Sequence, residues 1–117
     1  MTAIMSDHRL RPPEAPGMEA RVISGSQPGT VRVLVSGEID FDNATLLGEV
    51  LLAALASHRA TLLVDLEQVT FCDCAGLNIL LTARRAALRA GRGLHVTAAG
   101  CRVERLLNLT DTRSLLT

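Results

Sequence analysis

The stretch ATLLVDLEQVTFCDCAGLNILL, residues 60–81, decides the fold of this chain. Its first half is an almost continuous apolar run, which predicts a strand of a parallel sheet that is covered on both faces. Its second half has the spacing of a helix, which we expect from about Ala75 to Ala90. At the junction, Cys72 and Cys74 flank Asp73, and the question is which function requires these three residues there.

The regions on either side of this junction predict further strands and helices. Residues 18–24 and 30–37 are short β-branched runs around the turn signal SGSQPG, and they predict two antiparallel strands. Residues 94–98 predict another strand, residues 101–110 a last helix, and residues 111–117 a tail or a short edge strand. Between residues 43 and 58 we expect a helix with Asp42 or Asn43 as its N-cap.

Both long helices show an apolar stripe that predicts their inner face. In the first helix the stripe contains Leu46, Leu47, Val50, Leu51, Ala54 and Leu55. In the second helix it contains Leu77, Leu80, Leu81, Ala87 and Leu88.

The order β-β-α-β-α-β-α predicts an α/β fold. We expect a mixed, mostly parallel sheet of four to five strands, with three or more helices and right-handed crossovers. In such sheets, ligands and partners meet the loops at the carboxyl ends of the strands. The segments GEIDFD, residues 37–42, and FCDCAG, residues 71–76, both lie at that edge, so we expect them side by side.

Length and composition exclude several functions. At 117 residues the chain forms one domain, which we place at residues 18–117 behind a flexible arm at 1–17 that contains three prolines. The formal net charge is zero and only two residues are aromatic, which argues against nucleic acid as a partner. No apolar run reaches the roughly 18 residues of a membrane span, so we expect a cytoplasmic protein without a membrane partner.

The cysteines permit three kinds of chemistry, of which only one stays open. A closed zinc site needs four ligands, and Cys101, His58 and His95 belong to other elements, so we expect no metal and no cofactor. Nothing places a base beside a nucleophilic thiol, so we expect no enzymatic activity. A redox-sensing role for Cys74 stays open, because a helix N-terminus favours a thiolate although the neighbouring Asp73 opposes it.

Three motifs resemble one known family, the STAS domains (sulfate transporter and anti-sigma factor antagonist). They are VSGEIDFDNATLL at residues 35–47, LLVDLEQVTFCDCAGLNILLTARRAALRAG at 62–91 and VERLLNLT at 103–110. The resemblance covers about residues 18–116, nearly the whole of the expected domain, and implies a STAS-like fold. It is closest to the stand-alone bacterial anti-sigma factor antagonists, also called anti-anti-sigma factors.

The resemblance implies a partner and a switch. Such an antagonist binds an anti-sigma factor with a serine-kinase domain of the histidine-kinase-like ATPase type, which releases a sigma factor. The kinase phosphorylates a serine in the family motif D-S-[ST]-G, and the complex then breaks. In this chain Asp73 matches the aspartate and Gly76 the glycine, whereas Cys74 and Ala75 stand in place of the two hydroxyl residues.

We therefore expect a partner-binding protein that the usual serine phosphorylation does not regulate, present as a monomer or weak homodimer. The expected partner surface consists of Glu38, Asp40, Asp73, Cys74, Ala75, Gly76, Leu77 and Asn78, with Cys74 at the position of the phosphoacceptor. Two alternatives are a STAS-domain thiol sensor that uses Cys74 and a STAS subunit of a larger regulatory assembly.

Overall fold

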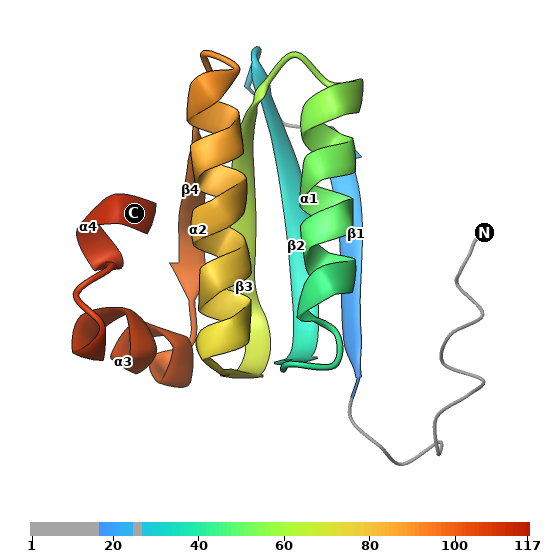
Figure 1. Ribbon diagram of the computed structural model, residues 1–117. Coiled ribbons are helices and arrows are strands. Elements are labelled where there is room, and N and C mark those ends of the chain that lie inside the picture. Colours follow the sequence, from blue (N-terminus) through green and yellow to red (C-terminus); the bar gives the residue numbers. More distant parts are fainter. Residues whose placement is uncertain (1–16, 25–26) are drawn as a thin grey trace.

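The computed structural model describes residues 17–24 and 27–117. Residues 1–16, nearly all of the predicted arm, lie outside the described residues. The elements are β1 (Met18–Ser24), β2 (Thr30–Ile39), α1 (Ala44–Ser57), β3 (Thr61–Cys72), α2 (Cys74–Arg89), β4 (Leu94–Ala99), α3 (Cys101–Leu109) and α4 (Arg113–Leu116) (Figure 1). No helix in this part of the chain combines the length and the apolar character needed to cross a membrane.

The four strands form one sheet in the order β1-β2-β3-β4. β1 runs antiparallel to β2, while β2, β3 and β4 are parallel to one another. The predicted hairpin and the predicted mostly parallel sheet are therefore confirmed. The carboxyl ends of β2, β3 and β4 lie at one edge of the sheet, at the bottom of Figure 1.

Only one face of the sheet is covered by the two long helices, so the prediction that β3 is covered on both faces was wrong. α1 and α2 lie side by side on one face (Figure 1). Along β3, buried Leu62, Val64 and Leu66 alternate with half-buried residues. One of the latter, Asp65, accepts a hydrogen bond from Arg32 of β2 at 3.0 Å. The apolar run of β3 predicted two covered faces because it includes Leu63, which lies on the less covered face of the sheet.

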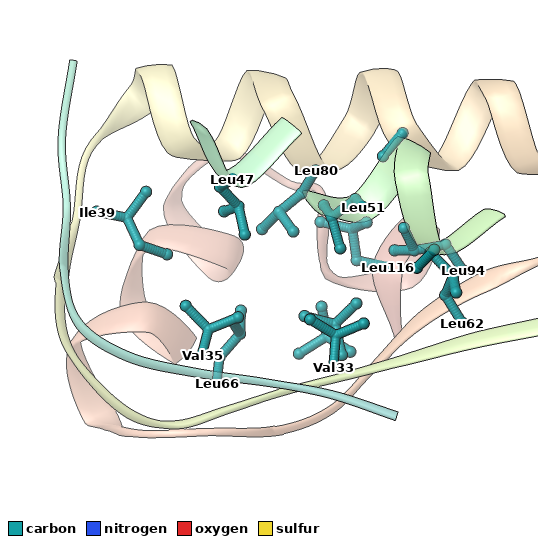
Figure 2. Close-up of a cluster of buried hydrophobic side chains, with 14 of the residues drawn as sticks. Val33, Val35, Ile39, Leu47, Leu51, Leu62, Leu66, Leu80, Leu94 and Leu116 are labelled. Atoms are coloured by element: carbon teal, nitrogen blue, oxygen red, sulfur yellow. The ribbon is translucent and has the colours of Figure 1, made fainter. Parts of the chain in front are cut away.

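The core lies between the sheet and the helices. Figure 2 shows Val33, Val35 and Leu66 from the strands facing Leu47, Leu51 and Leu80 from α1 and α2. Leu116 is fully buried as well, and it belongs to the short helix α4, where a tail or an edge strand was expected. An ion pair between Arg113 and Glu104 joins α4 to α3. The last residues of the chain thus close the core beside β4.

Each long helix is rotated relative to its predicted inner face. In α1, Leu47, Leu51 and Leu55 are buried as expected, but Leu46 is 39% exposed. In α2, Leu88 was expected inside and is 50% exposed. The packing of the two helices on each other explains the difference in α1: Gly48 is buried against Ile79 of α2, and this close approach turns Leu46 outward.

Arg92 ties the end of α1 to the loop before β4. Its Nη1 donates to the carbonyl oxygen of Leu55 at 2.7 Å and also to that of His58. The last carbonyls of a helix have no partner within the helix, and a cation at this end interacts favourably with the helix dipole. Arg92 therefore satisfies groups that are otherwise left to solvent.

Two glycines are required by close backbone approach at the carboxyl edge of the sheet. Gly37 has φ +92°, and a Cβ there would collide with the carbonyl oxygen of Gly17. A Cβ on Gly76, in the first turn of α2, would lie 2.6 Å from Cγ2 of Ile39 and 2.7 Å from Sγ of Cys72. The start of α2 therefore packs directly on the ends of β2 and β3.

Replacing Arg92 by Ala should lower the free energy of unfolding by about 1–3 kcal/mol, because two carbonyls at the end of α1 lose a charged donor. Urea denaturation followed by circular dichroism measures this change. Arg59→Ala is the matched control, since Arg59 is exposed in the loop after α1. Equal stability of the two variants would show that the clamp contributes nothing.

Gly76→Ala should lower the free energy of unfolding by about 1–3 kcal/mol through overpacking, although alanine favours a helix by about 1 kcal/mol over glycine. The control is Gly48→Ala in α1, where the new Cβ meets the flexible end of Ile79 at 3.2 Å. We expect the control to change stability by less than about 1 kcal/mol. A neutral Gly76→Ala would contradict the tight contact.

Candidate partner-binding site

The loops after β2 and β3 meet at the carboxyl edge of the sheet, as predicted from the topology. Ile39 at the end of β2 pairs with Cys72 at the end of β3. One residue further, the backbone N–H of Asp73 donates to the carbonyl oxygen of Ile39 at 3.2 Å. Ile39 is fully buried and anchors the first loop to the core. The two loops therefore form one continuous surface.

The loop between β2 and α1 is held by two side chains that bond to its own backbone. Oδ1 of Asp40 accepts from the N–H groups of Asp42 at 3.0 Å and Asn43 at 3.1 Å. Asn43 is 3% exposed; its Oδ1 accepts from the N–H of Asp40 at 2.9 Å and its Nδ2 donates to the carbonyl of Glu38 at 2.8 Å. These reciprocal bonds fix the shape of the turn.

Of the two predicted N-caps of α1, Asn43 occupies the position and Asp42 does not. The side chain of Asn43 makes no capping bond, because both its oxygen and its amide are used on the turn that precedes the helix.

Asp73 fixes the start of α2. Its Oδ1 accepts from the backbone N–H groups of Ala75 at 3.0 Å and Gly76 at 3.2 Å, which is the bonding of an N-cap residue. The next residue, Cys74, is the first of the helix, and its side chain is exposed. Cys74, which was expected at the phosphoacceptor position, thus lies at an exposed helix start beside a carboxylate.

The three thiols differ in environment. Burial raises the pKa of Cys72 to about 12, with smaller contributions from Asp73 and Cys74, so this thiol stays protonated at neutral pH. Cys74 and Cys101 are exposed, and none of the three is in a disulfide. Within residues 17–24 and 27–117, no three His, Cys, Asp or Glu side chains are grouped so that they could hold a metal ion.

The predicted site residues divide into a surface set and a supporting set. Cys74 and Asn78 are exposed, and Glu38, Asp40, Asp73 and Ala75 are partly exposed around them. Gly76 and Leu77 are buried, Gly76 against Ile39 and Cys72 and Leu77 in the core. Gly76 and Leu77 thus support the surface from below.

Sequence reasoning missed the importance of Asn43 and Phe41. Asn43 was assigned a capping role only, and an asparagine after two aspartates in a loop is also the signal for a bonded turn. Phe41 is 80% exposed in that turn, and it is one of only two aromatic residues in the chain. The position of Phe41 between two acids, Asp40 and Asp42, is the sequence signal that predicts an exposed aromatic side chain here.

All charged side chains in the two loops and at the start of α2 are acidic. Residues 38–43 and 72–78 contain four carboxylates, those of Glu38, Asp40, Asp42 and Asp73, and no basic residue. A surface of this kind is complementary to a partner with Arg or Lys side chains, and it repels added negative charge.

The chain is similar to several known proteins. The chain is 25% identical over 99 residues to a protein named anti-sigma-B factor antagonist from Staphylococcus aureus (strain NCTC 8325 / PS 47), covering 85% of this chain and 92% of that protein. The protein of the same name in Staphylococcus aureus (strain COL) gives the same values.

Two solved structures share the fold. A crystal structure of an anti-sigma factor antagonist from Mycobacterium paratuberculosis aligns with a TM-score of 0.74 and 29% identity, covering 86% of this chain and 83% of that one. The anti-sigma factor antagonist SpoIIAA in its unphosphorylated form aligns with a TM-score of 0.70 and 17% identity over 85% and 86% of the chains, which supports the fold alone.

The family itself follows from a model described as "Mlab, STAS domain", which matches residues 24–117. This match includes both loops of the candidate site and every element from β2 to α4. The resemblance seen in the three motifs and the predicted STAS-like fold are confirmed. The chain belongs to the STAS domain family.

Proposed function

We propose that this protein is an anti-sigma factor antagonist. It binds an anti-sigma factor that carries a serine-kinase domain of the histidine-kinase-like ATPase type, and a sigma factor is thereby released. The partner surface consists of the two joined loops and the start of α2, with Glu38, Asp40, Asp73, Cys74, Ala75 and Asn78 at the surface. Gly76 and Leu77 support it from below.

The observation that carries this proposal is the fixed geometry of that surface. Asp40 and Asn43 hold the first loop, Asp73 holds the helix start, and a backbone hydrogen bond from Asp73 to Ile39 joins the two. A surface that is ordered before binding loses less conformational entropy in the complex. The names of the relatives in Staphylococcus aureus and Mycobacterium paratuberculosis point to the same function.

The replacement of serine by Cys74 separates binding from the usual release signal. A thiol is close in size to a hydroxyl group, so the shape of the surface is kept. A serine kinase does not transfer phosphate to a thiol, and the neighbouring Ala75 has no hydroxyl group either. The antagonist therefore stays bound to its partner under conditions in which a serine-containing relative is phosphorylated and released.

A negative charge at position 74 should imitate the release signal. We expect Cys74→Asp to weaken binding to the anti-sigma factor at least about tenfold, because the new carboxylate lies among four others and faces a cationic partner. The measurement is biolayer interferometry of the purified protein against each purified anti-sigma factor encoded in the same genome.

Two controls accompany this variant. Cys74→Asn has the same shape as Cys74→Asp without its charge, and it should bind nearly as the wild type does. Cys101→Asp adds the same charge to the exposed first residue of α3, beyond β4, and should leave binding unchanged. Unchanged affinity of Cys74→Asp would remove position 74 from the partner surface.

Restoring the serine should restore the switch. With ATP and the anti-sigma factor, we expect Cys74→Ser to be phosphorylated and released, while the wild type and Cys74→Ala stay unmodified and bound. Intact-mass spectrometry of the antagonist and co-elution on a sizing column report the two effects. Phosphorylation of the wild type would place the acceptor at another residue and contradict this account.

One observation favours a thiol sensor as the second candidate function: Cys74 is exposed at the partner surface, whereas Cys72 is buried. Hydrogen peroxide oxidises a thiolate to a sulfenate with loss of water, which adds bulk at position 74. In this alternative, peroxide weakens partner binding in the wild type and has no effect on Cys74→Ala. Insensitivity of the wild type to peroxide would eliminate it.

The thiols should react in two classes. At pH 8 about one Cys72 side chain in ten thousand is a thiolate, because this pH lies four units below its pKa of about 12. A thiol-reactive dye should therefore label Cys74 and Cys101 rapidly and Cys72 only after urea is added. The double variant Cys74→Ala/Cys101→Ala should take up no dye while folded, and rapid labelling would show that Cys72 is accessible.

A further inference from the structure

Helix α1 carries apolar side chains on its outer face as well as on its inner face. Its 14 residues include a single charged side chain, that of Glu49. The exposed residues lie within an arc of about 140° at 100° per residue, and they are Thr45, Leu46, Glu49, Leu52, Ala53, Ala56 and Ser57. Leu46 and Leu52 are 39% and 45% exposed.

The neighbouring helix shows that this composition is not required by the fold. α2 lies beside α1 on the same face of the sheet (Figure 1). Its exposed residues are Cys74, Asn78, Thr82, Arg85, Leu88 and Arg89, so its outer face is mainly polar. The outer face of α1, with two leucines, two alanines and one charged residue, is more apolar than the outer face of α2, and this chain leaves it uncovered.

Phe41 extends this apolar face toward the proposed partner surface. It lies three residues before Ala44, the first residue of α1, and is 80% exposed, the largest exposed fraction among the large apolar side chains of the described residues. The turn that carries it is fixed by the bonds of Asp40 and Asn43. The ordered backbone of this turn therefore keeps the side chain of Phe41 exposed to solvent, directly next to Asp40 of the proposed surface.

The charges on this part of the chain indicate what covers it. Residues 38–57 contain the acids Glu38, Asp40, Asp42 and Glu49 and no Arg, Lys or His. A second copy docked face to face would oppose these four carboxylates with four more, which is unfavourable. A partner with cationic side chains around an apolar centre would pair with them.

We propose that Phe41, Leu46, Leu52, Ala53 and Ala56, which lie around Glu49, form a docking strip for the anti-sigma factor. The complementary surface of the anti-sigma factor is an apolar groove edged by Arg or Lys side chains. This inference rests on the proposed function and extends its surface from the loops along α1. Phe41 is the anchor of the strip, since aromatic side chains on ordered loops carry a large share of binding energy.

The test uses the full chain and the same purified anti-sigma factors, with biolayer interferometry as the readout. Phe41→Ser should weaken binding by about 30-fold or more, which corresponds to about 2 kcal/mol. Leu46→Gln and Leu52→Gln should each weaken it about three- to tenfold. Raising the ionic strength from about 0.05 to about 0.5 M should slow association, because the rim of the complex pairs opposite charges.

Exposed leucines outside the strip provide matched controls. Leu109→Gln at the end of α3, 77% exposed, matches Phe41, and Leu88→Gln in α2, 50% exposed, matches Leu52. Both should bind as the wild type does. Since all the side chains replaced are exposed, the variants should unfold within about 0.5 kcal/mol of the wild type in urea, so a loss of binding is not a loss of fold.

The outcomes separate this inference from the function on which it rests. If Cys74→Asp weakens binding and Phe41→Ser does not, the strip is overturned and the antagonist function stands. If no anti-sigma factor binds the wild type, both are overturned. If the wild type sediments as a dimer that Phe41→Ser converts to a monomer, a second copy covers the strip and the proposed occupant is wrong.

Discussion

The contact of the first turn of α2 with the ends of β2 and β3 is the constraint on which the rest of the structure depends. Gly76 leaves no room for a side chain against Ile39 and Cys72. The same three residues fix the distance between the sheet and α2, bury Ile39 and bring Asp73 within hydrogen-bond distance of the Ile39 carbonyl. Because α1 begins directly after the loop that Ile39 anchors, its position also follows from this contact.

This constraint makes the proposed site a rigid surface. The carboxylates of Asp40 and Asp73 both accept hydrogen bonds from backbone N–H groups. They therefore order the loops in addition to giving them negative charge. A partner therefore meets a fixed arrangement of negative charges around an exposed thiol. In such a surface a change at position 74 acts directly on the partner, since the backbone around it has little freedom to adapt.

The site combines two properties that serve different steps of association. Like-signed charges at the surface accelerate the encounter with a cationic partner and exclude acidic ones. Exposed apolar side chains, here Phe41 and the outer face of α1, contribute to the lifetime of a complex through burial. In the proposed function, Cys74 in place of a serine adds no charge and removes no apolar side chain, so partner binding does not require a phosphorylation site.

Much of the fold could be predicted from the sequence, and the errors have identifiable physical causes. The order of the elements, the mostly parallel pairing and the meeting of the two loops follow from alternating elements and the handedness of their connections. The edge of the inner face of α1 was misassigned at Leu46, because α1 also carries apolar residues on its outer face and the contact of Gly48 with Ile79 sets the rotation of the helix. Similarly, the apolar run of β3 did not reveal that Leu63 lies on the less covered face of the sheet.

The location of the candidate residues at the carboxyl edge of the sheet could be predicted, and their burial and bonding only in part. The residue types at 38, 40 and 73–78 identified the edge of the sheet, but not that Asn43 is buried and bonds the turn, or that Gly76 and Leu77 lie beneath the surface. The role of Arg92 was also invisible, since its acceptors are backbone carbonyls 34 and 37 residues earlier in the chain. Sequence patterns report local periodicity, and these contacts join residues distant in the chain.

The sequence by itself determined the class of the fold, the order of its elements and the family, because all three depend on local periodicity and on motifs of adjacent residues. Only the tertiary structure decided which side chains of the site face solvent and which helix face is left uncovered. These properties depend on how α1 and α2 pack on each other and on the sheet. That packing is set by contacts between distant residues, such as Gly76 with Ile39 and Gly48 with Ile79.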